Sequence, residues 1–157
     1  MAERVPMTPR GAAKLREDLA QLKAERPKIS RDIGTAREHG DLKENAEYHA
    51  AKERQGMVEA QIKDMEDKLA RSEVIDPSKL SGNRIRFGAT ISLANTETDE
   101  HVTYQIVGAD EANIDEGLIS VSAPLARALI GREVGDEVSV SLPVGKRTYE
   151  VIEIVFR

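Results

Sequence analysis

The sequence contains no cysteine, and aromatic residues make up only 3% of its 157 positions. Without cysteine, neither a disulfide nor a thiolate metal site can form. No apolar run approaches the length of a membrane span, and the first residues lack the apolar core of a signal peptide, so we expect a cytoplasmic protein without a membrane partner. A Ser-His-Asp set, a P-loop and a GxGxxG motif are also missing, and nothing in the chain resembles a self-sufficient active site.

Charge is abundant but almost balanced. Charged residues make up 32% of the chain, yet the formal net charge is only −5. This balance argues against a protein that coats nucleic acid by itself. Residues 1–76 contain 15 basic and 16 acidic side chains, whereas residues 77–157 contain 8 and 12. Dense charge of mixed sign with few aromatics is typical of long solvated helices, which we expect in the first half.

Two stretches of the first half carry apolar side chains at alternating steps of three and four residues, the pattern of paired helices. The first seam consists of Ala12, Leu15, Leu19, Leu22, Ile29, Ile33 and Ala36. The second seam consists of Tyr48, Ala51, Gln55, Val58, Ile62, Met65 and Leu69. Arg26 occupies the one polar position in register with the first seam, and Thr8 is suited to cap its helix.

Folding the chain back at Gly40 places Leu22 near Ile62 and the leucines at positions 15 and 69 near each other. We therefore predict an antiparallel coiled-coil hairpin over residues 1–76, about 40 Å long at roughly 1.5 Å per residue. Pro27 lies inside the first helix, which we expect to bend there and continue. Because the seam residues near the turn are small or polar, the half of the hairpin next to the turn should be narrower and less stable.

In the second half of the chain, the spacing of the apolar residues changes from the helical pattern to the alternation of strands. Residues 77–83 combine Pro, Ser, Gly and Asn and form a linker. Alternating residues then predict strands at 84–94, 101–107, 118–122, 137–142 and 147–156. Ser122 can cap a short helix at 123–130, with Pro124 in its first turn. The sequence thus predicts an α+β protein with a hairpin followed by a small globular domain over 84–157, built on an antiparallel sheet with one short helix.

The tip of the hairpin, at 40–47, gathers acidic residues. Asp41 and Glu44 stand three residues apart after Gly40, and Glu47 follows. The pair fits a capping-box variant at a helix start. It also fits a weak Mg²⁺ site, because this ion takes one or two protein carboxylates and fills its other positions with water or phosphate. The two interpretations are compatible, and a second partner would have to supply the remaining ligands.

Other polar residues near the tip have ordinary explanations. His39 and His49 lack the further ligands of a zinc site, which favours solvated or hydrogen-bonded imidazoles. Four basic residues also lie nearby: Arg37, Lys43, Lys52 and Arg54. Their spacing favours a solvated face with paired charges, while contact with an RNA or DNA phosphate is the alternative. Tyr48 opens the second seam and is better suited to packing than to base stacking.

At this point the residues resemble a known family. The segment GDLKENAEYHAAKE at 40–53 is similar to the tip motif of bacterial GreA-type transcript cleavage factors. Matches continue in PMTPRGAAKLREDL (6–19), VID (74–76), FGAT (87–90) and LIGREVGDEV (129–138), so the resemblance covers nearly the whole chain. The related GreB type has a more basic hairpin. One departure is the sequence around Ser122, which differs from the Ser-Pro form of many members.

The resemblance implies a function that composition does not. Such factors bind RNA polymerase, insert the hairpin through its secondary channel, and dock an FKBP-like domain at the rim, where Ser122 and Pro124 are candidate contacts. In backtracked complexes Asp41 and Glu44 help to hold a second Mg²⁺ beside the RNA 3′ end and to orient water. The factor is then no enzyme itself, because the polymerase hydrolyses the RNA. The resemblance implies no cofactor in the isolated protein, which we expect to be a monomer.

Three other functions compete with this hypothesis. A family member that only inhibits polymerase by occupying its channel would normally have an altered tip, and this tip is intact. A prolyl isomerase or chaperone needs an aromatic-lined pocket, for which the domain offers only Phe87, Tyr104, Tyr149 and Phe156. A plain coiled-coil adaptor is the third possibility, and it would not bind polymerase.

Overall fold

The computed structural model describes residues 3–40 and 45–157. Their contacts divide them into two compact units. The hairpin unit comprises Glu3 with residues 12–72, and the globular unit comprises residues 4–11 and 73–157. The structure thus differs from the expected division at 76, because residues 4–11 group with the globular unit and not with the hairpin.

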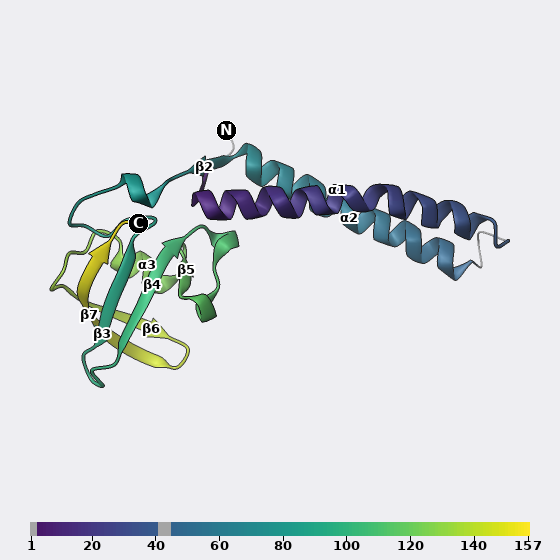
Figure 1. Ribbon diagram of the computed structural model, residues 1–157. Coiled ribbons are helices and arrows are strands. Elements are labelled where there is room, and N and C mark those ends of the chain that lie inside the picture. Colours follow the sequence, from purple (N-terminus) through teal and green to yellow (C-terminus); the bar gives the residue numbers. More distant parts are fainter. Residues whose placement is uncertain (1–2, 41–44) are drawn as a thin grey trace. The chain divides into compact units, whose positions relative to one another are not determined.

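The hairpin unit is built from two long helices, α1 (Pro9–Arg37) and α2 (Ala46–Ala70). They run antiparallel and side by side (Figure 1). Helix α1 continues through Pro27, as expected. Ile29, Ile33, Val58 and Ile62 form the buried cluster between the helices, and Leu19, Leu22, Tyr48 and Ala51 pack against it. This cluster draws its members from both predicted seams, and Leu22 and Ile62 both belong to this packing.

Buried residues occur along the whole hairpin. Ile29 and Ala36 are each only 3% exposed, and Ile62 is 1% exposed. The leucines toward the open end, at positions 15, 19, 22 and 69, are only partly buried. Ile29 and Ala36 lie toward the turn, but Ala12 and Ile62, each 1% exposed, lie toward the open end, so burial does not distinguish the half of the hairpin near the turn. Its lower stability stays a prediction.

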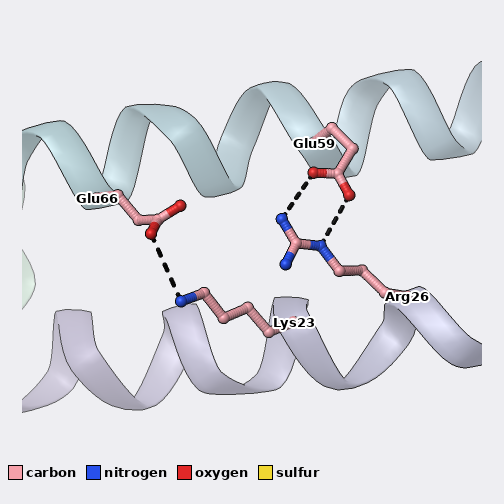
Figure 2. A network of polar contacts seen from close by, with 4 residues as sticks. All are labelled: Lys23, Arg26, Glu59 and Glu66. Atoms are coloured by element: carbon pink, nitrogen blue, oxygen red, sulfur yellow. Dashed lines mark hydrogen bonds and ion pairs between the residues drawn. The ribbon is translucent and has the colours of Figure 1, made fainter.

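Charged side chains also bridge the two helices (Figure 2). Arg26 makes a two-pronged contact with Glu59, with nitrogen–oxygen distances of 2.7 and 2.8 Å. Lys23 lies 3.5 Å from Glu66, one step toward the open end. These side chains are about half exposed, so each pair stabilises the hairpin only weakly. Each pair joins one position of α1 to one position of α2, which favours this register between the helices.

A short sheet that the sequence did not predict joins strand β1 (Val5–Met7) to strand β2 (Ser72–Val74). The pairing continues beyond β2, because the backbone N–H of Ile75 donates to the carbonyl of Met7 at 2.8 Å. Within the expected linker, Pro77–Lys79 form a 3-10 turn, η1. The side chain of Asp76 caps it by accepting from the backbone N–H of Ser78 at 3.0 Å.

Five strands form the sheet of the globular unit. They are β3 (Thr90–Asn95), β4 (His101–Val107), β5 (Leu118–Ser120), β6 (Glu137–Leu142) and β7 (Gly145–Val155). Their spatial order is β5-β4-β3-β7-β6. The short helix α3 (Pro124–Leu129) follows β5. The α+β class is confirmed, and the bounds of β4 and β6 match the prediction.

Two details of the sheet add to or correct the prediction. The pair β4–β5 is parallel, whereas the other three pairs are antiparallel, as expected for an antiparallel sheet. A parallel pair requires a crossover, and the crossover here contains two 3-10 turns, η2 (Ala109–Glu111) and η3 (Ile114–Glu116). The first strand begins at Thr90 and not at 84. The preceding Ile85 instead exchanges backbone hydrogen bonds with Gly131 and Arg132, both at 2.8 Å.

The core of the globular unit lies beneath this sheet. Its fully buried side chains include Ile91, Leu93, Ile106, Leu129 and Val151. The four aromatic residues of the domain, Phe87, Tyr104, Tyr149 and Phe156, are partly buried and pack against the same core. They therefore serve as packing groups. Among the described residues, no helix is both long and apolar enough to cross a membrane.

Candidate functional site: the tip of the hairpin

The end of α1 prepares the chain reversal. After Arg37, the backbone N–H groups of Glu38 and His39 donate to the carbonyls of Thr35 and Ala36, both at 3.1 Å. Gly40 then adopts a φ of +115°, which side chains other than glycine's rarely allow. The predicted helix break at this glycine is confirmed, with the helix itself ending three residues earlier.

Asn45 organises the return of the chain. Its side-chain oxygen accepts from the backbone N–H of Tyr48 at 3.0 Å, so it is the N-cap of α2. Its side-chain nitrogen donates to the carbonyl of Ala36 at 2.5 Å. One side chain thus ties the start of α2 to the last turn of α1. The N-cap of α2 is Asn45, and the capping-box pair Asp41 and Glu44 lies outside the described residues.

The two carboxylates expected to act at the tip, Asp41 and Glu44, lie outside the described residues, as does Lys43. The described residues on either side contribute exposed carboxylates at Glu38 and Glu47. Within residues 3–40 and 45–157, no group of three or more His, Asp or Glu side chains is arranged to hold a metal ion. A cation at the tip would therefore depend on the pair at 41 and 44 and on ligands from elsewhere.

The other basic residues of the tip make contacts within the hairpin. The guanidinium of Arg37 lies 5.9 Å from the ring centroid of Tyr48, within the range of a cation–π contact. Lys52 donates to the side chain of Gln55 at 3.3 Å. Arg54 forms an interhelical ion pair with Glu25 at 2.5 Å. Of these contacts only that of Arg54 is a charge pair, and it joins the two helices and not residues four apart on one helix. The phosphate alternative stays a prediction.

The aromatic and imidazole rings near the tip also pack locally. Tyr48 joins the buried cluster of the seam, as predicted. The ring of His49 meets it edge-on at a centroid distance of 5.5 Å. His39 is exposed in the turn after α1.

The second expected contact surface, at the start of α3, differs from the prediction in one respect. Ser122 does not cap the helix: the N-cap position is Ala123, which offers no side-chain hydrogen bond. Instead the hydroxyl of Ser122 lies 2.8 Å from that of Ser120, and its backbone N–H donates to the same oxygen at 3.1 Å. Pro124 is the first helical residue, as predicted, and both Ser122 and Pro124 are exposed.

Sequence reasoning missed Asn45, although a signal was present. Asn is among the most favoured N-cap residues, and a run of good helix formers follows it. The Asp-x-x-Glu pattern four residues earlier also fits a helix start, so the N-cap was predicted at Asp41. What the described residues beside the tip offer chemically is the exposed carboxylates of Glu38 and Glu47, which are oxygen ligands.

Comparison with known proteins gives consistent results over the whole chain. Residues 5–74 match the family model described as "Transcription elongation factor, N-terminal", and residues 80–156 match "Transcription elongation factor, GreA/GreB, C-term". Transcription elongation factor GreA of Hyphomonas neptunium is 55% identical, covering 99% of each chain. The GreA of Francisella philomiragia is 57% identical, covering 98% of each. Among solved structures, the Gfh1 protein of Thermus thermophilus is 29% identical with a TM-score of 0.45, covering 97% of this chain and 99% of that one.

Proposed function

Because the chain belongs to the GreA/GreB family of transcription elongation factors, we propose that it binds RNA polymerase and stimulates the polymerase's own cleavage of backtracked RNA. The protein is then a factor and not a nuclease. The hairpin enters the secondary channel, and the globular unit docks at the channel rim, with Ser122 and Pro124 among its contacts. The outcome is rescue of arrested complexes whose RNA 3′ end has been extruded.

In this proposal the reacting site is shared between two proteins. Asp41 and Glu44 supply carboxylate oxygens, which are the ligands that Mg²⁺ prefers. In two-metal hydrolysis of a phosphodiester, the second ion stabilises charge on the attacking and leaving oxygens. The role of the tip is to help hold that ion beside the polymerase's own site and to orient the attacking water. Two carboxylates alone hold Mg²⁺ weakly, so the activity appears only in the complex.

The length of the hairpin suits it to carry the proposed carboxylates into a channel. Helix α2 has 25 residues, which at roughly 1.5 Å per residue gives an arm close to 40 Å long. A dry seam and interhelical ion pairs stiffen it. Arg37, Lys43, Lys52 and Arg54 are candidate contacts for RNA phosphates near the tip, and the first, third and fourth would have to exchange the contacts described above.

The observation that carries the proposal is the combination of the GreA-type tip motif at 40–53 with identity of about 55% to GreA proteins over essentially the full chain. The deciding experiment is cleavage of RNA in a reconstituted backtracked complex. We expect the wild-type protein to accelerate cleavage. Asp41→Asn and Glu44→Gln should each abolish the acceleration while the variants still compete with the wild type for polymerase.

Glu47→Gln is the matched control, because it removes an exposed carboxylate from the same tip without touching the proposed pair. It should retain most of the stimulation. If the Asp41→Asn, Glu44→Gln double variant stimulates cleavage as well as the wild type does, the proposed role of the tip is wrong. If the wild-type protein binds polymerase but only slows elongation, the protein is an inhibitor that occupies the channel.

A further inference from the structure

One edge of the five-stranded sheet is open. Strand β6 lies at the end of the spatial order, with β7 as its only neighbour among the described strands. A sheet edge presents a row of unpaired backbone N–H and C=O groups, and proteins usually blunt it with a very short strand, a bulge, proline or lysine. Strand β6 has six residues without proline or lysine, and its register with β7 is unbroken.

The opposite edge of the same sheet is protected. Strand β5 has only three residues. The turn η2 packs against it. The backbone N–H and C=O of Leu118, at the start of β5, are bonded to Asn113 at 2.9 and 2.8 Å. The edge at which a further strand can be added is therefore β6.

The hydrogen bonds of β7 identify the backbone groups that β6 turns outward. The N–H of Val151 donates to the carbonyl of Asp136 at 2.9 Å, and its carbonyl accepts from the N–H of Gly135 at 2.8 Å. Successive residues of a strand bond alternately to its two neighbours. The β7 residues two and four positions before Val151 thus also bond toward β6, where they lie opposite Val138 and Val140. The remaining residues of β6 before Leu142 turn their backbone groups outward: Glu137, Ser139 and Ser141.

Only one register lets two copies of β6 pair through all of these groups. In an antiparallel pair the outward-facing residues must lie opposite one another. With Ser139 on the two-fold axis, Glu137 of each copy faces Ser141 of the other, and about six backbone hydrogen bonds form. A shift toward the end of the strand brings Glu137 opposite Pro143, which has no N–H. A shift toward the start would require the N–H of Gly135, which is already bonded to β7.

The same register brings opposite charges together. On the exposed face of the sheet, Glu137 lies beside Glu150 at one end of β6, and Ser141 lies beside Lys146 at the other. Like charges directly opposite each other destabilise a strand pair. None of these three charged side chains makes an ion pair within the described residues. In the pair, only the small Ser141 separates Glu137 of one copy from Lys146 of the other, roughly 10 Å between Cα atoms, which both long side chains span.

We propose that β6 is a self-association edge, through which two copies of this chain pair antiparallel about a two-fold axis at Ser139. Val138 and Val140 are already only 2% and 5% exposed. Pairing therefore adds backbone hydrogen bonds and charge contacts but buries little apolar surface, so the association is weak. The expected monomer is then the form in dilute solution. The pairing does not depend on the proposed function.

Disulfide formation tests the register, because the chain has no cysteine of its own. In Ser139→Cys the two Cα atoms would lie about 5.5 Å apart, within the range that a disulfide spans. We expect covalent dimers under mild oxidation at high protein concentration. Ser141→Cys is the matched control, because it lies on the same exposed edge but faces Glu137. It should cross-link far less by itself, and a mixture with Glu137→Cys chains should give the mixed dimer.

Sedimentation measures the association without cross-linking. The wild type should associate reversibly as its concentration rises, and less so in high salt. Ser139→Pro removes no hydrogen bond within one copy, because this N–H faces outward, but it removes both central donors of the pair. It should weaken the association on the order of ten-fold or more. Circular dichroism and thermal unfolding show whether the variant folds.

Charge reversal keeps the test valid if Ser139→Pro folds poorly. Glu137→Lys and Lys146→Glu change exposed side chains only. Each should weaken the association several-fold, and the double variant should restore it, because opposite charges again meet across the pair.

Three results would overturn the proposal. One is a wild type that stays monomeric at every soluble concentration. Another is association that neither Ser139→Pro nor the charge reversals weaken, or equal cross-linking of Ser139→Cys and Ser141→Cys. The third is a monomeric wild type whose affinity for polymerase falls in Ser139→Pro, because the edge then binds an extended segment of a partner and not a second copy.

Discussion

The side-chain nitrogen of Asn45 donates to the carbonyl oxygen of Ala36 at 2.5 Å, while its oxygen caps α2. Because this one residue serves both helices, Asn45→Ala should destabilise the hairpin by about 1–2 kcal/mol, the sum of a lost cap and a lost hydrogen bond. Amide hydrogen exchange at Tyr48 and its neighbours should accelerate. The same variant should reduce stimulated cleavage, since the tip between the helices is less well fixed.

Asn45→Asp separates the two roles. An aspartate keeps the capping acceptor and is favoured at a helix N-terminus, but when ionised it cannot donate to Ala36. It should therefore preserve the protection of the α2 amides and lose only the bridge. Equal exchange rates in wild type and Asn45→Ala would contradict the role of this residue.

The pair Arg26–Glu59 should make the stability of the hairpin depend on acid pH. The hydrogen bond from Arg26, aided by its charge, holds the pKa of the Glu59 carboxyl below its ordinary value. A lowered folded-state pKa gives stabilisation that is present above the unfolded pKa of about 4.3 and is lost as the pH falls through the folded value. The wild type should unfold at a higher temperature than Glu59→Gln at neutral pH, and the difference should vanish in acid.

Salt provides the control for this pair. Both side chains are about half exposed, so added salt should screen the interaction and reduce the difference at neutral pH. A double-mutant cycle with Arg26→Gln should assign the effect to the pair. A difference that persists unchanged through acid pH would mean that Glu59 stabilises the hairpin by some other route.

Ile62 is the least exposed large apolar side chain in the described part of the hairpin. It is 1% exposed, and Ile→Ala substitutions at buried sites cost about 2–5 kcal/mol. Ile62→Ala should lower the unfolding free energy of the hairpin by that amount in denaturant titration followed by circular dichroism. Met57→Ala, at a 60% exposed position on the same helix, should change it by less than about 0.5 kcal/mol.

The isolated protein should bind Mg²⁺ only weakly. The described residues contain no group of three acidic or histidine ligands, and the proposed pair at 41 and 44 offers two carboxylates at most. Titration followed by nuclear magnetic resonance should give shifts that do not saturate at low millimolar ion. Tight, saturable binding that disappears in Asp41→Asn would show that the tip is a complete site by itself, contrary to the proposal.

Much of the fold could be predicted because its patterns are long. The two seams repeat over many turns, which fixed the helices and their pairing, and the alternation in 101–107 and 137–142 gave both strands with their bounds. The pairing of β1 with β2 could not be predicted, because three residues are too few to display a period. The parallel pair β4–β5 depends on the path of residues 108–117, which carries no periodic signal.

The site was less accessible to sequence reasoning for a related reason. Capping residues are single positions, so Asp41 and Asn45 both satisfied the same rule. At the shorter helix the rule favoured Ser122, whereas the N-cap is Ala123, a residue that the rule disfavours. The hydrogen bond from the backbone N–H of Thr8 to the carboxylate of Glu111 joins residues 103 positions apart. Neither residue type is unusual where it stands, and only the folded chain brings them together.

The passage of α1 from one unit into the other decides where this protein can be cut and recombined. A fragment that starts at the linker, near residue 80, would lack both β1 and the partner of Glu111. Chimaeras that exchange arms between relatives should therefore join at residues 12 and 72, leaving the first eleven residues with the globular donor. Arms grafted at 1 and 76 would combine a helix cap from one parent with an acceptor from another.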